Sequence, residues 1–342
     1  MRVLITCDAF PPKTGGGTEF VTFKTAKLLK ENGHEVLVVC NGDPKIREYD
    51  GIRTIRINLK KQFLANILWI PVLLKLAGKF DVIHSFTFDT SFASLIAARL
   101  KRKPVILTVQ GIYGDAWIEM RGSWIRGKFR KFFEKLYLRL PVDLFHIISE
   151  YNLKLGMRMG LRRNKSIVVP WGIDWNKYKM REKKPFVLFV GRIDPQKGLI
   201  YLVEVAKKLP NIKFLIAGKG PLKEKLEKIA PKNVKFLGYV SERKKRELYS
   251  RALIFCLPSI GEGLGIVHLE AMASGCAIVS TIPFDYSGFT VEPRNVDEMA
   301  TKIKYLLENK KLAIKMGKEN RKRVKKYSWE RILKIYNCLE KL

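Results

Sequence analysis

The sequence predicts an α/β protein built of two doubly wound domains that face each other across a cleft. The chain has 342 residues, more than one hydrophobic core usually organises, so two domains are expected. Short apolar runs alternate with segments of helical periodicity, and this alternation starts again after residue 184. The runs are almost continuously apolar, which is typical of parallel strands covered by helices on both faces.

The first domain is expected over residues 1–170. Its predicted strands are Val3–Cys7, Glu35–Cys40, Thr54–Ile57, Asp81–Phe86, Val105–Gln110, Leu144–Ser149 and Ser166–Pro170. Helical spacing predicts helices over Thr18–Asn32, Gln62–Ala77, Ser91–Lys101 and Arg126–Leu140. Gly33 stands where a C-terminal glycine cap would end the first helix. The repeating strand–helix order implies parallel strands joined by right-handed crossovers.

A polar, basic segment without periodicity, residues 171–184, is expected to be a linker. In the second domain, residues 185–330, the predicted strands are Phe186–Val190, Lys213–Ala217, Val234–Leu237, Leu253–Leu257 and Ala277–Ser280. The helices predicted between them are Leu199–Leu209, Leu222–Ile229, Arg243–Arg251 and Ile266–Ser274. Helices are also predicted over Val296–Glu308, Leu312–Tyr327 and Trp329–Leu342. We expect the final helix, 331–342, to join the first domain.

The composition excludes a disordered or fibrous protein, because 47% of the residues are apolar and 28% are charged. The cysteines are odd in number and far apart in the sequence, at Cys7, Cys40, Cys256, Cys276 and Cys338. They form neither a disulfide framework nor a CxxC metal pair, as expected in a reducing cytosol. The apolar start, Met1–Asp8, is too short for a secretion signal, and Phe63–Leu74 is too short to span a bilayer.

A glycine-rich loop follows the predicted strand Leu253–Leu257 and leads into a helix near Ile266. Its glycines, at positions Gly261, Gly263 and Gly265, let backbone N–H groups approach a ligand closely. The helix start adds unsatisfied donors that suit a phosphate or a sugar hydroxyl. Glu262 lies in the loop and Glu270 about one turn inside the helix, so they would reach different parts of one elongated ligand. The alternative is a glycine-rich turn with a capping Glu.

A second concentration of charge follows the predicted strand Phe186–Val190. This strand ends at Gly191, and Arg192 and Lys197 lie on the connection that leads through Gly198 to the next helix. Two cations at the carboxyl edge of a parallel sheet suit a diphosphate, because one is a forked guanidinium and the other a point ammonium.

Two further glycine turns follow predicted strands. Gly15, Gly16 and Gly17 follow the first strand and could line the cleft from its opposite wall, but they do not form the GxGxxG of a nicotinamide site. Gly218 and Gly220 form a close-approach turn in the second domain. His84 and His268 are interpreted as structural, because a lone His near a strand end is more often buried and hydrogen-bonded than catalytic.

In their order along the chain, these motifs resemble those of the retaining glycosyltransferases of the two-domain GT-B type, group 1, family 4. The resemblance covers nearly the whole chain. It rests on Gly16-Gly17-x-Glu19, Asp81–His84, Val169–Asp174, Gly191-Arg192 with Lys197-Gly198, Gly218-x-Gly220-Pro221, and Glu262 with Glu270. The combination in this order is specific, whereas no single motif is.

The resemblance implies two Rossmann-like domains and a sugar-nucleotide donor held mainly by the second domain. Arg192 and Lys197 would hold the diphosphate, Glu270 would accept the ribose hydroxyls, and Glu262 would contact the donor sugar. The remaining donor-binding positions would be Gly16, Gly17, Gly191, Gly218, Gly220, Gly263, Leu264, Gly265 and Ile266. No metal and no other cofactor is expected. Transfer would retain the configuration of the sugar, with the leaving diphosphate taking the proton of the acceptor.

The chain departs from the family pattern at two places. The family usually has a His at the end of the strand Val105–Gln110, where it reaches the donor sugar; this chain has Gln110, which hydrogen-bonds but does not titrate near neutrality. We place Gln110 with Arg192, Lys197 and Glu262 among the catalytic residues. The family's Gly-Gly-x-x-Glu loop is replaced by the shorter segment Ile282–Gly288.

The net charge of +33, from 65 basic and 32 acidic residues, indicates a negatively charged partner or surface. Residues 121–139 combine cations with aromatic side chains, as interfacial membrane helices do, and 59–79 is a second candidate contact with anionic lipid. The alternatives are a solvated charged face and the charge-rich surface of a thermophile protein. Nucleic-acid binding is disfavoured, because the charge is spread over both halves and no nucleic-acid motif is present.

The sequence therefore predicts a cytoplasmic enzyme, peripheral at the inner face of the cell membrane. It would move a sugar from a nucleotide-diphosphate sugar to a glycan or to a lipid-linked glycolipid acceptor. Two alternatives stay open: a sugar-nucleotide epimerase or phosphorylase of the same fold, and a weakly active subunit that binds nucleotide sugars.

Overall fold

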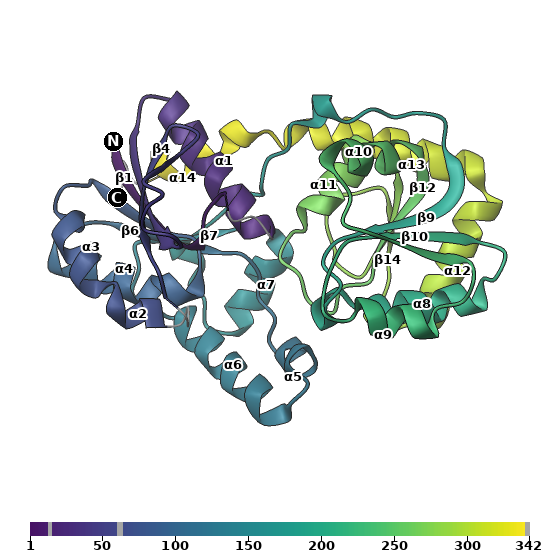
Figure 1. Cartoon of the computed structure of the whole chain (residues 1–342), viewed down its shortest axis with the longest axis horizontal. Helices are drawn as coiled ribbons and strands as arrows, with labels where there is room; N and C mark the ends of the chain where they lie inside the picture. The colour runs from purple at the N-terminus through teal and green to yellow at the C-terminus, as the bar shows by residue number, and fades with distance from the viewer. Residues whose placement is uncertain (13–15, 60–63, 339–342) are drawn as a thin grey trace. The chain divides into compact units, whose positions relative to one another are not determined.

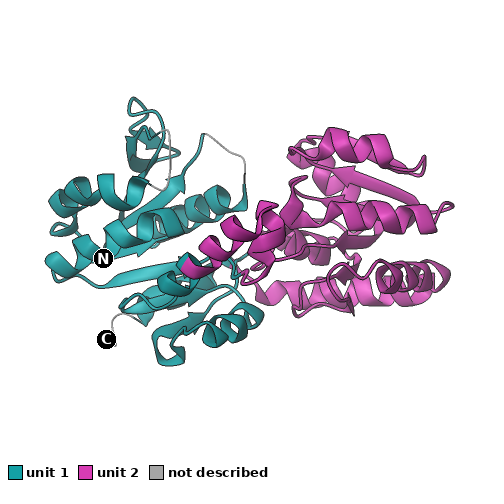
Figure 2. Cartoon of the chain, turned by 90° about the horizontal axis from the view of Figure 1, so that it is seen from below, with its two compact units in different colours: residues 1–112, 133–172, 329–342 teal, residues 113–132, 173–328 magenta. Residues whose placement is uncertain are grey.

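The computed structural model describes residues 1–12, 16–59 and 64–338. Its chain forms two compact units, residues 1–112, 133–172 and 329–342 in the first, and residues 113–132 and 173–328 in the second (Figure 2). Each unit contains one sheet and its own hydrophobic core. The predicted class, two parallel α/β sheets with helices on both faces, is confirmed.

The first unit is built on an eight-stranded sheet of order β3-β4-β2-β1-β5-β6-β7-β8, parallel except for β3 against β4. Its strands are β1 (Arg2–Ala9), β2 (Glu35–Asn41), β3 (Glu48–Tyr49), β4 (Ile52–Ile57), β5 (Val82–Ser85), β6 (Val105–Val109), β7 (Leu144–Ile147) and β8 (Ser166–Val168). The central strands β5, β6 and β7 are buried along their whole length. Their continuous apolar runs follow from this burial on both faces.

Helices cover both faces of this first sheet (Figure 1). On one face lie α2 (Ala65–Leu68), α3 (Ile70–Ala77) and α4 (Phe88–Leu100), and on the other α1 (Gly17–Glu31) and α14 (Leu333–Asn337). The remaining helices before the second sheet are α5 (Ala116–Arg121), α6 (Trp124–Tyr137) and α7 (Glu150–Arg158). Tyr336 of α14 shares a 2.7 Å hydrogen bond with the buried His84 of β5, which holds the C-terminal helix on this unit.

The second unit is built on a parallel six-stranded sheet of order β11-β10-β9-β12-β13-β14. Its strands are β9 (Lys184–Val190), β10 (Lys213–Ala217), β11 (Val234–Gly238), β12 (Ala252–Leu257), β13 (Ala277–Ser280) and β14 (Gly288–Thr290). One face carries α8 (Leu199–Lys208), α9 (Lys223–Ile229) and α12 (Val296–Glu308), and the other α10 (Glu242–Arg251), α11 (Ile266–Ala273) and α13 (Lys310–Arg323) (Figure 1). The β12 strand is fully buried at the centre of this core.

Local signals in the sequence explain several helix ends. Gly33 has a φ of +78°, and its N–H and that of His34 bond to carbonyl groups in the last turn of α1, as predicted for a glycine cap. Ser149 accepts a hydrogen bond from the N–H of Asn152 and so caps α7. Such a cap stabilises a helix by about 1 kcal/mol.

The structure differs from the sequence predictions at the weakest patterns. The helix predicted over Gln62–Ala77 is two short helices, α2 and α3, with Pro71 in the first turn of α3; Gln62 itself lies outside the described residues. Proline has no N–H to donate, so it starts a helix more readily than it continues one. Strands β3 and β14 and helix α5 were not predicted, because each has six residues or fewer. The nine-residue helix α7 was not predicted either.

Candidate functional site

The strand order reverses once in each sheet, and most of the predicted site residues follow the strands at these two places. In the second sheet the reversal lies between β9 and β12, and in the first it lies between β1 and β5. In doubly wound sheets, ligands bind outside the carboxyl ends of the strands where the order reverses. Arg192 and Lys197 follow β9, Glu262 follows β12, and Gly16 follows β1.

The loop after β9 is shaped by Asp194. This residue caps the 3₁₀ turn Pro195–Lys197 by accepting a 3.2 Å hydrogen bond from the backbone N–H of Lys197. Its other carboxylate oxygen lies 2.7 Å from the Arg192 guanidinium. Arg192 keeps 61% of its side chain exposed, so Asp194 orients it without burying it. An Asp-Pro pair directly after a strand is a capping signal, and this signal could have identified Asp194 in the sequence.

The loops after β9 and β12 are bound to each other. Ile260 donates its N–H to the Gln196 carbonyl over 2.9 Å, and the Gln196 side chain donates to the Gly261 carbonyl over 3.1 Å. Gly198 has a φ of +60°, and a Cβ there would lie 2.0 Å from the Pro258 carbonyl oxygen. Glycine is therefore required at 198, because only glycine allows the two loops to approach so closely.

Lys197 and Glu262 form an ion pair between these two loops. Their side chains are only 15% and 12% exposed, so each charge is largely removed from water and depends on the other. The nearby His268 is fully buried and shares a 2.9 Å hydrogen bond with Ser280. Burial, with a smaller contribution from the Lys197 charge, lowers the pKa of His268 to about 3. This histidine is neutral near pH 7 and belongs to the packing, as predicted.

Glu270 lies in α11 and is 5% exposed. Its Oε1 accepts hydrogen bonds from the Tyr178 hydroxyl at 2.9 Å and from the Lys245 ammonium at 2.8 Å. Burial lowers the pKa of Lys245, but the Glu270 carboxylate beside it outweighs this effect, and the pKa lies above its ordinary value. Burial and the same carboxylate raise the pKa of Tyr178. No motif in the sequence points to Tyr178 or Lys245.

The second oxygen of Glu270, Oε2, is buried and accepts no hydrogen bond of good geometry from the part of the chain that the structure describes. The buried Tyr249 hydroxyl is close to this carboxylate, and burial together with Glu270 raises the pKa of Tyr249. A buried carboxylate oxygen without a partner is costly and is expected to find a donor. The two carboxylates also have separate cations, Lys197 for Glu262 and Lys245 for Glu270. Glu262 in the loop and Glu270 in α11 therefore do not share a cation.

Helix α11 begins at Ile266 with Gly265 as its N-cap, and no side chain caps it. The first N–H groups of a helix have no partner within the helix, and they carry partial positive charge. Gly263 and Leu264 lead into this helix start from the loop that carries Glu262. The start of α11 can therefore offer backbone donors to an anion or a hydroxyl at the carboxyl end of β12.

Gly218 and Gly220 are explained by packing within the unit. A Cβ at Gly218 would lie 1.8 Å from the Gly191 carbonyl oxygen, and one at Gly220 would lie 2.2 Å from the Ile193 carbonyl oxygen. Ile193 in turn donates its N–H to the Lys219 carbonyl over 2.8 Å. The close approach at this turn is thus between the loops after β9 and β10. A contact of Gly191, Gly218 or Gly220 with a donor stays a prediction.

In the first unit, Gln110 follows β6 and donates a 3.3 Å hydrogen bond to the carbonyl of Phe86, which follows β5. The next residue, Thr87, donates to the carboxylate of Asp8 near the end of β1, over 2.7 Å. Burial, followed by the charge of Asp89, raises the pKa of Asp8 to about 7. Asp8 was not among the predicted site residues, although an Asp at the carboxyl end of the first strand was a signal for it.

Gly16 and Gly17 lie where α1 begins. Gly16 is the N-cap and Gly17 the first helical residue, and no side-chain cap satisfies the first N–H groups. A Cβ at Gly16 would lie 2.8 Å from a carboxylate oxygen of Glu19 in the first turn, so glycine leaves room for that side chain. Gly15 lies outside the described residues.

No group of three or more His, Cys, Asp or Glu side chains suited to a metal ion occurs among the described residues. Over the same ranges, 1–12, 16–59 and 64–338, none of the helices has the length and apolar character needed to cross a bilayer.

Comparison with known proteins connects this arrangement to a family. The model of the family described as "Glycosyl transferases group 1" matches residues 174–323, and that of "Glycosyltransferase Family 4" matches residues 15–177. The phosphatidyl-myo-inositol mannosyltransferase of Mycolicibacterium smegmatis is 25% identical in an alignment of 378 positions that covers 99% of this chain and 94% of that protein. The sulfoquinovosyl transferase SQD2 of Arabidopsis thaliana is 35% identical, over 89% of this chain and 66% of its own.

A solved structure agrees with these matches. HepE of Anabaena, crystallised in complex with UDP-glucose, superposes with a TM-score of 0.80 and 17% identity, and the match covers both chains completely. At this level of identity the likeness concerns the fold.

Proposed function

Because this chain belongs to the group 1, family 4 glycosyltransferases, which transfer a sugar from a nucleotide sugar, we propose that it is a retaining, metal-independent enzyme. The donor is a nucleotide-diphosphate sugar, bound at the carboxyl ends of β9 and β12. The observation that carries this proposal is the pair of joined loops at that point, which present Arg192, Lys197 and an uncapped helix start.

In the proposed reaction, the bond between the sugar C1 and the diphosphate oxygen breaks, and a bond from C1 to the acceptor oxygen forms on the same face. The proton of the acceptor hydroxyl passes to the leaving diphosphate, so the balance needs no carboxylate nucleophile. Negative charge grows on the diphosphate as the bond breaks. Arg192 and Lys197 stabilise that charge, and a preorganised contact of this kind is worth about 3–4 kcal/mol of barrier.

The two carboxylates take different parts of the donor in this proposal. Glu270 accepts the ribose hydroxyls, through Oε2, the oxygen that is not bound by Tyr178 and Lys245. Tyr178 and Lys245 hold this carboxylate in place through Oε1. Glu262 contacts the donor sugar and keeps Lys197 directed toward the loop. Gln110 supplies a hydrogen bond to the sugar in place of a histidine.

We take UDP-glucose as the first donor to test, since HepE was crystallised with it. For the acceptor, the name of the Mycolicibacterium smegmatis relative, a phosphatidyl-myo-inositol mannosyltransferase, directs attention to lipid-linked hydroxyl groups. We therefore propose a glycan or lipid-linked acceptor.

A membrane-bound acceptor fits the surface of α6. Six large apolar side chains of this helix are between 47% and 74% exposed, namely Trp124, Ile125, Phe129, Phe132, Phe133 and Leu136. With about 100° of rotation per residue, all of these except Trp124 form one stripe, opposite the buried Gly127 and Glu134. Cations flank the stripe on both sides, at Lys128 and Lys135 and at Arg126 and Arg130. This is the pattern of a helix that lies in the interface of an anionic membrane.

The other predicted membrane segment, 59–79, contributes less. Trp69 and Leu73 are fully buried in the core of the first unit, while Ile67 and Leu68 of α2 are exposed. Residues 60–63 of the segment lie outside the described part of the chain. We therefore assign the main membrane contact to α6 within residues 121–139.

Product analysis tests the proposed reaction. The purified protein is incubated with UDP-, GDP-, ADP- and CMP-sugars, with and without a lipid extract, and the products are identified by mass spectrometry and by NMR of the anomeric centre. We expect a new glycosidic bond of retained configuration. An isomerised sugar nucleotide would instead indicate an epimerase, and a sugar phosphate would indicate a phosphorylase. Binding without turnover above background would favour the weakly active subunit.

Vesicle flotation tests the membrane contact. Binding to vesicles with anionic lipid should exceed binding to neutral vesicles and should weaken as salt is added. The double variant Ile125→Ser/Phe129→Ser should lose most of this binding, because it removes two apolar anchors. Leu100→Ser, which changes an apolar side chain that is 67% exposed on α4, is the matched control. Equal flotation on neutral and anionic vesicles would contradict the proposal.

A further inference from the structure

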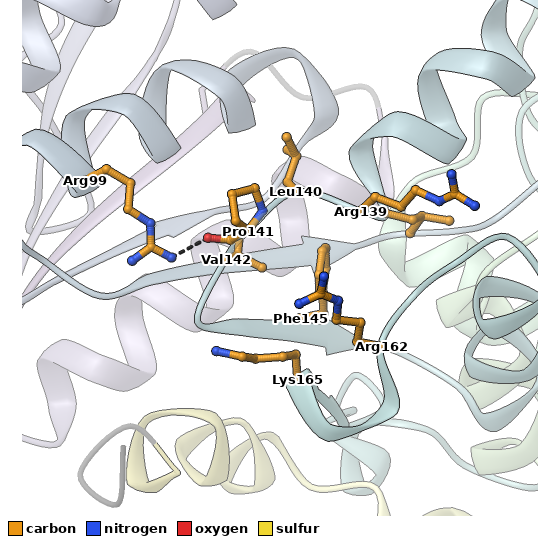
Figure 3. Close-up of a pocket in the computed structure, with 9 residues that line it drawn as sticks. Arg99, Arg139, Leu140, Pro141, Val142, Phe145, Arg162 and Lys165 are labelled. Atoms are coloured by element: carbon orange, nitrogen blue, oxygen red, sulfur yellow. Dashed lines mark hydrogen bonds between the residues drawn. The ribbon is translucent and has the colours of Figure 1, made fainter.

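A second charged site lies in the first unit, at the edge of its sheet where the strands begin. This edge is opposite to the carboxyl edge, which carries Gly16 and Gln110. A pocket of about 120 Å³ is lined by residues that precede strands rather than follow them: Arg99 before β6, Pro141 and Val142 before β7, and Arg162 and Lys165 before β8. The amino ends of parallel strands meet at one edge, so these residues are brought together there (Figure 3). Nothing in the proposed transfer reaction uses this edge.

The charge of the pocket is almost entirely positive. Arg99, Arg139, Arg162 and Lys165 all line it. Arg99 is held by the Pro141 carbonyl and by the carboxylate of Asp143 at 3.4 Å. For Arg162 and Lys165, the described residues contain no carboxylate partner within ion-pair distance. Like charges gathered in a concave site repel each other and concentrate a positive potential, which an anion would relieve.

Packing fixes the shape of the pocket, at its floor and at one wall. Leu138, Val142 and Phe145 form an apolar floor and are at most 3% exposed. Arg139 lies against Gly160, where a Cβ would be 2.4 Å from the guanidinium Nε and where φ is +105°. Glycine at 160 therefore leaves the space that the Arg139 side chain occupies at the rim.

The size and lining of the pocket limit its ligand. Sites for drug-sized molecules measure roughly 300–1,000 Å³, so this one suits a single small group. A guanidinium fork and an ammonium are the side chains that bind phosphate oxygens best. The apolar floor fits a short carbon stem attached to such a group. We propose that this pocket binds a phosphate group, carried by a lipid headgroup or by a small soluble compound, with Arg162 and Lys165 as its main ligands.

Binding is tested first with inorganic phosphate and glycerol 3-phosphate, by the rise in melting temperature over chloride at equal ionic strength. The variant Arg162→Gln/Lys165→Gln removes two charges and leaves two shorter, neutral side chains that can still form hydrogen bonds. We expect its apparent Kd for phosphate to rise at least tenfold. Its melting temperature without phosphate should stay equal or increase, because repulsion is relieved. Arg162→Gln alone serves if the double variant does not fold.

Two comparisons separate the pocket from other causes. Lys310→Gln/Lys311→Gln removes the same charge from an exposed helix start on α13 and should bind phosphate as the unmodified protein does. Lys197→Ala weakens any phosphate binding at the proposed donor site, and it should keep the part of the phosphate response that Arg162→Gln/Lys165→Gln loses. The proposal is overturned if phosphate raises the melting temperature no more than chloride does. It is also overturned if the α13 variant loses as much phosphate binding as Arg162→Gln/Lys165→Gln, or if Lys197→Ala is the only variant that loses phosphate binding.

Vesicles distinguish the two sources of the phosphate. Flotation is compared on vesicles with phosphatidic acid, which presents a phosphomonoester, and on vesicles with phosphatidylserine at the same surface charge. A selective loss of binding to phosphatidic acid in Arg162→Gln/Lys165→Gln assigns the pocket to a lipid headgroup. The place of the pocket is consistent with a lipid headgroup, because one of its lining residues, Leu138, directly follows the proposed membrane helix α6. Unchanged flotation together with lost phosphate binding assigns it to a soluble phosphate compound.

Discussion

The two sheets reverse their strand order in the same way, but the chemistry at the two reversal points differs. At β9 and β12 the loops carry Arg192 and the Lys197–Glu262 pair, beside the uncapped start of α11. At β1 and β5 the side chains are Asp8 and Thr87, joined through residue 86 to Gln110 of the neighbouring strand. With its pKa raised to about 7, Asp8 is partly protonated near neutrality.

The topology of each sheet provides the location of a binding site, whereas the loop residues decide the charge of the ligand that fits there. The second unit has cations and helix-start donors, which suit a diphosphate. The first unit has a hydroxyl, an amide and a carboxyl that titrates close to neutrality, which suit neutral hydroxyl groups. The following variants test this division, from the largest expected effect to the smallest.

Replacing Lys197 should have the largest effect. We expect Lys197→Ala to lower kcat by about 10²–10³-fold, because the departing diphosphate loses a preorganised cation. Donor turnover is measured at saturating donor and acceptor. Lys207→Ala, which removes an exposed lysine of α8, is the control and should change kcat by less than about twofold. Turnover close to normal in Lys197→Ala would remove the electrostatic basis of the comparison.

The pH dependence of stability should report on Asp8. Because the pKa of Asp8 is raised in the folded protein, the folded state binds more protons than the unfolded chain between pH 4 and 7. The free energy of unfolding should therefore fall as pH rises through this range, by about 3 kcal/mol from this group. Asp8→Asn should abolish that part of the decrease in urea unfolding at pH 5 and pH 8.

The control for this measurement is Asp297→Asn, which changes a carboxylate that is 82% exposed on α12. Its unfolding curves should keep the pH dependence of the unmodified protein. If the free energy of unfolding of Asp8→Asn fell between pH 5 and pH 8 by as much as that of the unmodified protein, Asp8 would ionise normally. The first unit would then present an ordinary anion at the carboxyl edge of its sheet.

Removing Lys245, which donates a hydrogen bond to Glu270, should have a smaller effect on the kinetics than removing Lys197. In Lys245→Met the carboxylate stays in place but loses one of its two hydrogen-bond donors. We expect the KM for the donor to rise about tenfold with a smaller change in kcat, since loss of one charge-assisted hydrogen bond costs about 1.5 kcal/mol. Lys244→Met, at the exposed neighbouring position, is the matched control. Equal kinetics in both variants would show that Lys245 does not support Glu270 in donor binding.

Metal removal should have the smallest effect. Dialysis against EDTA, followed by assay in metal-free buffer, should leave the transfer rate within about twofold of the untreated enzyme, because cations of the chain take the charge of the diphosphate. A rate that falls and is restored by Mg²⁺ or Mn²⁺ would assign part of that task to a metal.

The fold could be predicted in large part from local pattern. The apolar runs Val3–Cys7 and Leu253–Leu257 were found within two residues of the ends of β1 and β12, because strands buried on both faces leave a continuous apolar signal. Helices α8 and α12 were equally clear from their periodicity. Edge strand β14 left no comparable signal, and Pro71 was the one local sign of the break between α2 and α3.

The sequence by itself determined which chemistry follows each strand, because Arg192, Lys197 and Glu262 stand in loops contiguous with β9 and β12. Only the tertiary structure decided the partners. Glu270 meets Tyr178 and Lys245, which are 92 and 25 residues away, and Lys197 meets Glu262, 65 residues away. Arg99, Arg162 and Lys165 likewise share a pocket because three strands begin at one edge. Such contacts depend on strand order and helix packing, and the spacing of residues along the chain predicts neither of them.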